Sequence, residues 1–210
     1  MKIRALLAAA AIAACIAGNF AQAQVGNNTA VLNPNTAEAS QLAGLPHLTP
    51  QLVQSIVAAR PLLTTAAFDA VLKSLSAEQR AELYSRLFLQ INLNTASRAE
   101  IMLIPGMTNR MVREFEEYRS YTSLAQFRKE MGKYVDATEV ARLEQFVFIP
   151  LNLNTAAEAD LRTIPGMTPR MVREFLEYRP YASIEQFRRE IGKYVDAKEV
   201  ARLESYVTLK

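Results

Sequence analysis

The chain has 210 residues, of which 50% are hydrophobic, and it carries 24 Lys and Arg against 21 Asp and Glu. Two of the basic residues, Lys2 and Arg4, lie in a leader-like segment, so the rest of the chain has 22 basic residues against 21 acidic ones, a net charge of +1. Proteins that bind duplex DNA tightly usually neutralise several phosphates with surplus Lys and Arg, and this balance excludes such a surplus.

Residues 1–23 have the pattern of a secretory signal peptide, with a basic start, an alanine-rich apolar stretch and the small-x-small cleavage site Ala21-Gln22-Ala23. The apolar stretch is too short to remain as a membrane span, so we expect no integral span in the mature chain. The mature protein would begin at Gln24 and be periplasmic or secreted. As an alternative, Ile12-Ala13-Ala14-Cys15 resembles a lipoprotein signal, which would anchor the protein through a lipid on Cys15.

Residues 90–149 and 150–210 are closely similar copies of one unit, offset by sixty positions. Asn92-Leu93-Asn94-Thr95-Ala96 returns as Asn152-Leu153-Asn154-Thr155-Ala156, and a worn third copy within 24–89 opens with Asn33-Pro34-Asn35-Thr36-Ala37. We therefore predict a signal peptide over 1–23 and a tandem array of three units, over 24–89, 90–149 and 150–210. The joins between units are apolar, as at Phe146–Leu151, which predicts packed contacts and not flexible linkers.

Each unit is expected to hold four short helices and almost no strand, so the predicted fold class is all-α. In the last unit the first helix would end before Pro165-Gly166, and Gly192 would end the third. The predicted N-caps of the four helices are Thr155, Thr168, Ser183 and Asp196.

These motifs resemble the helix-hairpin-helix domain of the ComEA-like family of exported competence proteins. The resemblance rests on the Asn-Leu-Asn-Thr-Ala run and on Ile164-Pro165-Gly166-Met167-Thr168 opening a second helix, and it covers all three units. It implies three helix-hairpin-helix pair units and non-sequence-specific binding of double-stranded DNA, as in DNA uptake. The same fold also occurs in proteins that do not bind DNA. The alternative is therefore a rigid structural or adaptor scaffold that contacts other envelope or secretion proteins.

In that family a glycine–hydrophobic–glycine turn presents bare backbone amides to a phosphate. Gly106 and Gly166 match the first glycine, but Thr108 and Thr168 occupy the place of the second, and a threonine that caps its own helix uses one of those amides. In the second hairpin Asp196 would repel a phosphate. We therefore expect weak DNA binding. The candidate DNA-binding residues are Gly106, Met107, Arg110, Lys133, Gly166, Met167, Arg170, Arg173, Lys193 and Lys198.

Each of these candidates also has a structural interpretation. Arg110 and Arg170 could form i,i+4 ion pairs with Glu114 and Glu174, and Arg113 and Arg173 could pair likewise with Glu117 and Glu177. The lysines could be solvated surface, and Gly132 and Gly192 could simply end helices. The tyrosines that recur beside Arg119 and Arg179 could stack on bases or belong to the core; they are Tyr118, Tyr121, Tyr178 and Tyr181.

Catalytic chemistry has few candidates in this sequence. His47 is the single histidine and Cys15 the single cysteine, which excludes a histidine-based triad and a cysteine or histidine metal cluster. The carboxylates fall on predicted helix caps and surfaces. We therefore expect no catalytic, cofactor or metal site and no enzymatic activity, and we rank an exported nuclease below the other two functions.

Overall fold

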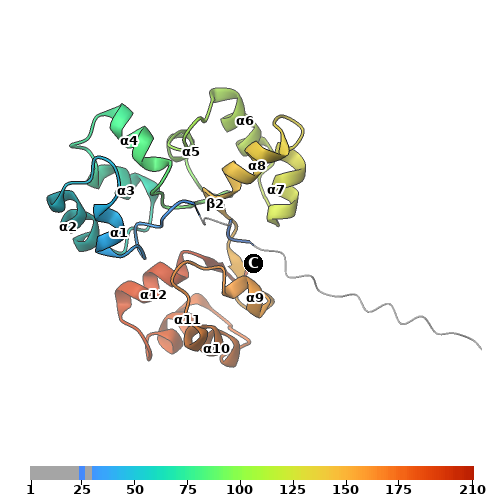
Figure 1. Ribbon diagram of the computed structural model, residues 1–210. Coiled ribbons are helices and arrows are strands. Elements are labelled where there is room, and N and C mark those ends of the chain that lie inside the picture. The colour runs from blue at the N-terminus through green and yellow to red at the C-terminus, as the bar shows by residue number, and fades with distance from the viewer. Residues whose placement is uncertain (1–23, 27–29) are drawn as a thin grey trace, which may run out of the picture.

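The computed structural model describes residues 24–26 and 30–210, and it arranges the helices in three groups around a central set of short strands (Figure 1). The first helix group holds α1 (Ala39–Ala43), α2 (Pro50–Ala58), α3 (Thr65–Val71) and α4 (Ala77–Tyr84). The second holds α5 (Arg98–Met102), α6 (Asn109–Glu117), α7 (Leu124–Met131) and α8 (Ala137–Glu144). The third holds α9 (Glu158–Leu161), α10 (Pro169–Glu177), α11 (Ile184–Ile191) and α12 (Ala197–Glu204).

The leader, with Cys15 and the expected cleavage site, lies outside the described residues. Within the described part, no helix has the length and hydropathy that crossing a bilayer would need.

Short polar side chains define where most helices begin. Thr168 caps α10, Ser183 caps α11 and Asp196 caps α12, each by accepting a hydrogen bond from the backbone amide three residues later, as predicted. The prediction that Thr155 caps the first helix of the third group is wrong. The α9 helix begins after Ala157 without a side-chain cap, because the Thr155 amide donates to the Asn152 side chain at 3.1 Å within the preceding turn.

The prediction of an all-α chain is wrong, because short parallel strand pairs close the helix groups. β1 (Ile91–Asn92) precedes the second group and pairs with β2 (Val147–Phe148), which follows it. In the same way β3 (Leu151–Asn152) pairs with β4 (Val207–Thr208), and in the first group Leu32 forms a parallel bridge with Leu87. The apolar joins therefore supply backbone hydrogen bonds as well as buried side chains, and the expectation of packed joins is confirmed.

After β1 and after β3 in the sequence, an asparagine and an arginine fix the turn that leads into the first helix of the group. The Asn94 side chain accepts a hydrogen bond from the Tyr121 amide at 2.7 Å and donates to its carbonyl at 2.9 Å. Arg119 donates to the Leu93 carbonyl at 2.8 Å, and Arg179 makes the equivalent bond to Leu153 in the third group. Tyr121 is buried, as is Tyr181 in the third group, so these two tyrosines belong to the core.

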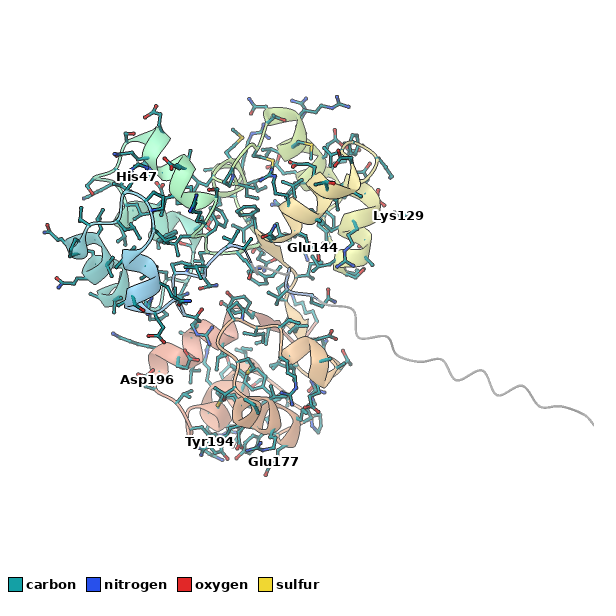
Figure 2. All side chains as sticks on the ribbon, viewed as in Figure 1. His47, Lys129, Glu144, Glu177, Tyr194 and Asp196 are labelled. Carbon is teal, nitrogen blue, oxygen red and sulfur yellow. The ribbon has the colours of Figure 1, made fainter. Side chains whose placement is uncertain are left out.

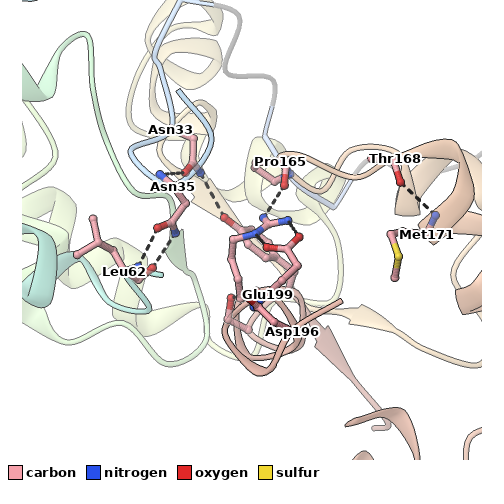
Figure 3. Close-up of polar contacts among 11 residues, drawn as sticks. Asn33, Asn35, Leu62, Pro165, Thr168, Met171, Asp196 and Glu199 are labelled. Atoms are coloured by element: carbon pink, nitrogen blue, oxygen red, sulfur yellow. Dashed lines mark hydrogen bonds and ion pairs between the residues drawn. The ribbon is translucent and has the colours of Figure 1, made fainter. Parts of the chain in front are cut away.

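The prediction of a tandem array is also wrong. In an array each unit contacts its neighbours in sequence, whereas here one continuous core joins the first and second groups, from Val31 to Ile149. A second core fills the third group, and the first group contacts it directly (Figure 3). The Asn33 amide donates to the Tyr206 hydroxyl at 3.4 Å across this boundary. The proposed division at 24–89, 90–149 and 150–210 stays a prediction.

Candidate nucleic-acid interface

The two glycine turns were the first predicted contacts for a phosphate. Gly106 and Gly166 have φ values of +76° and +75°, which glycine adopts with little strain. The Met107 amide donates to the Ile104 carbonyl at 3.0 Å, and the Met111 amide donates to the Thr108 hydroxyl at 3.3 Å. Met167 and Thr168 have the same bonds in the third group. Amides that a phosphate would need are therefore already engaged within the protein.

The turn at Gly166 also lies against the first helix group. Arg202 donates to the Pro165 carbonyl at 2.5 Å, and a Cβ atom at Gly166 would lie 2.9 Å from the Thr36 methyl group. At Gly106 the nearest neighbour of such a Cβ atom would be the Arg142 guanidinium, at 3.4 Å. The two turns therefore match in backbone conformation but differ in their surroundings.

The second hairpins do not reproduce a phosphate-binding glycine turn, and the helix-hairpin-helix assignment finds no support in them. Gly132 and Gly192 have φ values of −61° and −62° and act as ordinary helix C-caps. Asp196 accepts from the Glu199 amide at 2.8 Å as the cap of α12 (Figure 3). Lys198 lines a cavity of about 220 Å³ that is also lined by Arg60 of the first group, so it lies at the boundary between groups.

The structure gathers other candidates into two matching clusters. In the third group, Arg170 lies 5.3 Å from the Tyr194 ring centre, Lys193 lies 4.9 Å from the Tyr178 ring centre, and the two tyrosine hydroxyls are 2.8 Å apart. We call these four residues the α10 cluster. The α6 cluster of the second group has the same arrangement and consists of Arg110, Lys133, Tyr118 and Tyr134. Figure 2 shows Tyr194 and Glu177 on the outer part of the third group.

Sequence reasoning did not select Tyr134 or Tyr194 as site residues. A usable signal was present, because a Lys-Tyr pair follows the glycine at Gly132 and again at Gly192. The lysine of each pair contacts the ring of the tyrosine at the helix end, Tyr118 or Tyr178. The tyrosine of each pair offers its ring to the helix arginine, Arg110 or Arg170, in a second cation–π contact.

The arginines of these helices are exposed, and the ion pairs expected for them do not form. Among the ion pairs of the described residues there is none between Arg110 and Glu114 or between Arg113 and Glu117, and the same holds for Arg170 and Arg173 with the matching glutamates. The hydrogen bond with Tyr118, together with the nearby Glu114 carboxylate, raises the pKa of Tyr134. The i,i+4 interpretation is therefore wrong.

The two lysines of the clusters do have carboxylate partners. Lys133 pairs with Glu130, and Lys193 pairs with Glu190. The hydrogen bond in each pair raises the pKa of the lysine, so both stay charged at neutral pH. In residues 24–26 and 30–210, no group of three His, Cys, Asp or Glu side chains is placed to hold a metal ion.

Comparisons with known proteins give distant and partial similarities. No protein-family model matches the chain, and no solved structure matches it. The chain is similar to proteins named endonuclease/exonuclease/phosphatase family domain-containing protein 1. The Xenopus laevis protein is 30% identical over 131 residues, which cover 46% of this chain and 23% of the relative. The Homo sapiens protein is 26% identical over 154 residues, covering 55% and 25%. This chain thus spans about a quarter of each relative's length.

These names contradict two expectations from the sequence. The relatives are not named as competence proteins of the ComEA type, so the expected membership of that family is wrong. The expectation that the chain is not an enzyme is contradicted as well, because each name refers to an endonuclease/exonuclease/phosphatase family domain.

Proposed function

We propose that this chain binds nucleic acid, with duplex DNA as the ligand, through the α6 and α10 clusters together with the neighbouring arginines Arg113 and Arg173. The observation that carries the proposal is a set of exposed arginines without carboxylate partners in the described structure, two on α6 and two on α10. They are Arg110, Arg113, Arg170 and Arg173. Guanidinium groups match phosphate geometry, and the first turn of a helix adds a favourable positive dipole for an anion.

The tyrosines of each cluster orient this basic surface. A ring below Arg170 holds the guanidinium by a cation–π contact, which reduces the entropy lost when the arginine meets a phosphate. Because the Thr168 hydroxyl engages the Met171 amide, phosphate contact in this proposal comes from side chains. Such contacts carry no base information, so binding should not depend on sequence. Carboxylates such as Glu174 and Glu190 lie close by, and this favours weak binding.

The relatives support the proposal in a general sense. Endonucleases and exonucleases act on nucleic acids, so their name agrees with a nucleic-acid ligand. Duplex DNA is the finer choice, and it rests on the arginine geometry. Location is part of the same proposal: cleavage after Ala23 would place the protein in the periplasm or the medium.

Substitutions that replace arginine by uncharged glutamine test the proposal. We expect Arg170→Gln with Arg173→Gln to weaken duplex binding about tenfold, and Arg110→Gln with Arg113→Gln to do the same, since each pair removes two phosphate contacts. Arg162→Gln is the matched control, because the exposed Arg162 already pairs with Glu158 at 2.5 Å. Equal affinity in all variants would rule out these arginines as the DNA site. No duplex binding by the natural protein at low salt would reject the proposal and favour a scaffold function.

A further inference from the structure

The first helix group contains a groove of about 740 Å³, and part of its lining comes from positions that correspond to members of the α6 cluster. In the second group, Tyr134 lies two residues before the cap of α8, and Arg110 and Glu114 lie two and six residues after the cap of α6. The same steps in the first group lead to Ser74, Gln51 and Ser55, and all three line the groove.

The second tyrosine of the pair is also replaced. Tyr118 is the C-cap of α6 and donates to or accepts from the Tyr134 hydroxyl, whereas the C-cap of α2 is Ala59. Two phenol rings thus give way to a methyl and a hydroxymethyl group. The first group therefore lacks both rings of the tyrosine pair, and the groove is large enough to admit an aromatic ring from outside.

The lining of the groove indicates the charge and chemistry of an occupant. Its apolar side is formed by Leu48, Leu52, Val71 and Leu75. Polar groups from Thr49, Gln51, Ser55, Ser74 and Gln79 line the remainder. Lys73 and His47 also line it, and His47 is already paired with the Glu82 carboxylate at 2.8 Å, so Lys73 is the basic group that can meet an anion. Lys73 is exposed and forms no ion pair with any residue that the structure describes. An aromatic ring with hydrogen-bonding edges and an attached anion fits this lining.

We propose that this groove binds one unpaired nucleobase of a single-stranded nucleic acid, with the attached phosphate at Lys73. The inference rests on the proposed nucleic-acid function and adds a second, single-strand site to the duplex-binding clusters. Gln51 and the hydroxyl groups can pair with the donors and acceptors of a base edge, and Lys73 can neutralise a phosphate. Base-sized rings held against apolar side chains are the common mode of single-strand recognition.

The chain itself supplies the variant that closes the groove. Ser74→Tyr restores the residue found at the matching position of the other groups, and Ser40→Tyr on exposed α1 adds the same ring away from the groove. The probe is a 3′-fluorescein-labelled oligothymidylate of about ten nucleotides with a 5′-phosphate, followed by fluorescence anisotropy with the full-length protein. We expect Ser74→Tyr and, independently, Lys73→Ala to weaken single-strand binding about tenfold. Ser40→Tyr should bind as the natural protein does.

Duplex DNA measured in parallel separates the two proposals. The groove variants should leave duplex affinity unchanged, and the arginine variants should reduce it. Natural protein that binds duplex DNA but not the oligothymidylate would overturn the groove inference alone. Natural protein that does not bind duplex DNA, but binds the oligothymidylate in a way that Ser74→Tyr weakens, would overturn the cluster proposal alone. If the Ser74→Tyr protein has a native melting curve and an unchanged single-strand affinity, the groove is not a base site. The same conclusion holds if Ser74→Tyr changes the oligomeric state and not the single-strand affinity.

Discussion

Gly106 and Gly166 have nearly the same backbone conformation, yet alanine should be tolerated differently at each. A Cβ atom at positive φ costs about 1–2 kcal/mol at either position. At Gly166 that atom would also lie 2.9 Å from the Thr36 methyl group, which should add about 1 kcal/mol of overpacking. We expect chemical denaturation to show Gly166→Ala as the less stable variant. Thr36→Ser removes the methyl group, so in a double-mutant cycle Gly166→Ala should cost less unfolding free energy in the Thr36→Ser background. Additive effects would mean that the Cβ atom and the Thr36 methyl group do not touch in solution.

Asp160 provides a test of burial at the residue scale. Its carboxyl group is buried in α9, and desolvation raises its pKa. Below the pKa of about 4 that aspartate has in the unfolded chain, the carboxyl group is protonated in both the folded and the unfolded protein. The stability that the raised pKa contributes is then lost as the pH rises through the higher pKa of the folded protein. Asp160→Asn should therefore raise the melting temperature at pH 7 and change it little near pH 3. Glu158→Gln, which removes an exposed partner of Arg162, should give no such gain. A pH-independent effect of Asp160→Asn would exclude the desolvation account.

Single residues were predictable where their structure is local. Thr168, Ser183 and Asp196 cap helices because each side chain needs an amide only three residues away. Thr155 looked equivalent but sits in a turn fixed by the Asn152 side chain, and that competition is not visible in a capping pattern. Tyr194 was missed as a site residue because its partners lie sixteen and twenty-four positions earlier in the chain, at Tyr178 and Arg170.

At the scale of elements, β2 and the residue that follows it, Ile149, distribute their side chains between two cores. Val147 and Ile149 belong to the core of the first and second groups, whereas Phe148 belongs to the core of the third. The alternation of a strand explains this division, because successive side chains point to opposite faces. Phe148 packs on Tyr206 with ring centres 4.7 Å apart. The join is therefore a structural part of both cores.

Truncating Phe148 should accordingly be costly. Phe148→Ala is expected to lower the free energy of unfolding by about 3–5 kcal/mol, the usual loss for a buried phenylalanine. Leu63→Ala is the control, because Leu63 is 49% exposed and its truncation should cost less than about 0.5 kcal/mol. Urea denaturation measures both. A cost below 1 kcal/mol for Phe148→Ala would show that the join does not tie the third group to the others.

The segment after the expected cleavage site also belongs to this join. The Ile149 amide donates to the Gln24 carbonyl at 2.8 Å, and Val25 is buried in an antiparallel bridge with Phe148. Cleavage after Ala23 would keep these contacts, so we expect the exported protein to begin at Gln24. Intact-mass measurement of the exported protein decides this, and a lipid-modified Cys15 at the N-terminus would show that the lipoprotein alternative is correct.

The strands themselves could not be predicted from the sequence. Each is two residues long, and the partner of Ile91 is Val147, at the far end of the helix group. Periodicity cannot reveal strands of that length, whereas the helices α6 and α10 carry several turns of pattern and caps of their own. The apolar composition of the joins did indicate burial, because it depends on residue type alone.

At the scale of the whole molecule, the sixty-residue similarity predicted a tandem array, and the contact between the first and third groups contradicts it. In that contact Asn33 and Thr36 lie against Tyr206 and Gly166, which are more than 100 positions later in the chain, and all four resemble residues with local roles. Differences in sequence between the three helix groups also produce the candidate sites. Arginines appear on α6 and α10, while the matching positions of α2 hold Gln51 and Gln54; the groove lies where the first group has Ser74 in place of the cluster tyrosine.

This distribution of charge sets how duplex binding should respond to salt. The logarithm of the binding constant falls with the logarithm of salt concentration by about 0.9 for each phosphate contact. The four arginines of α6 and α10 can make at most four contacts, and without the leader residues Lys2 and Arg4 the balance of 22 basic against 21 acidic residues supplies little further attraction. We expect a slope between about −2 and −4 for the natural protein. Arg170→Gln with Arg173→Gln should reduce it by about 2 if both clusters engage one duplex. A slope near zero would exclude phosphate contact, and one steeper than about −6 would require basic residues outside the clusters.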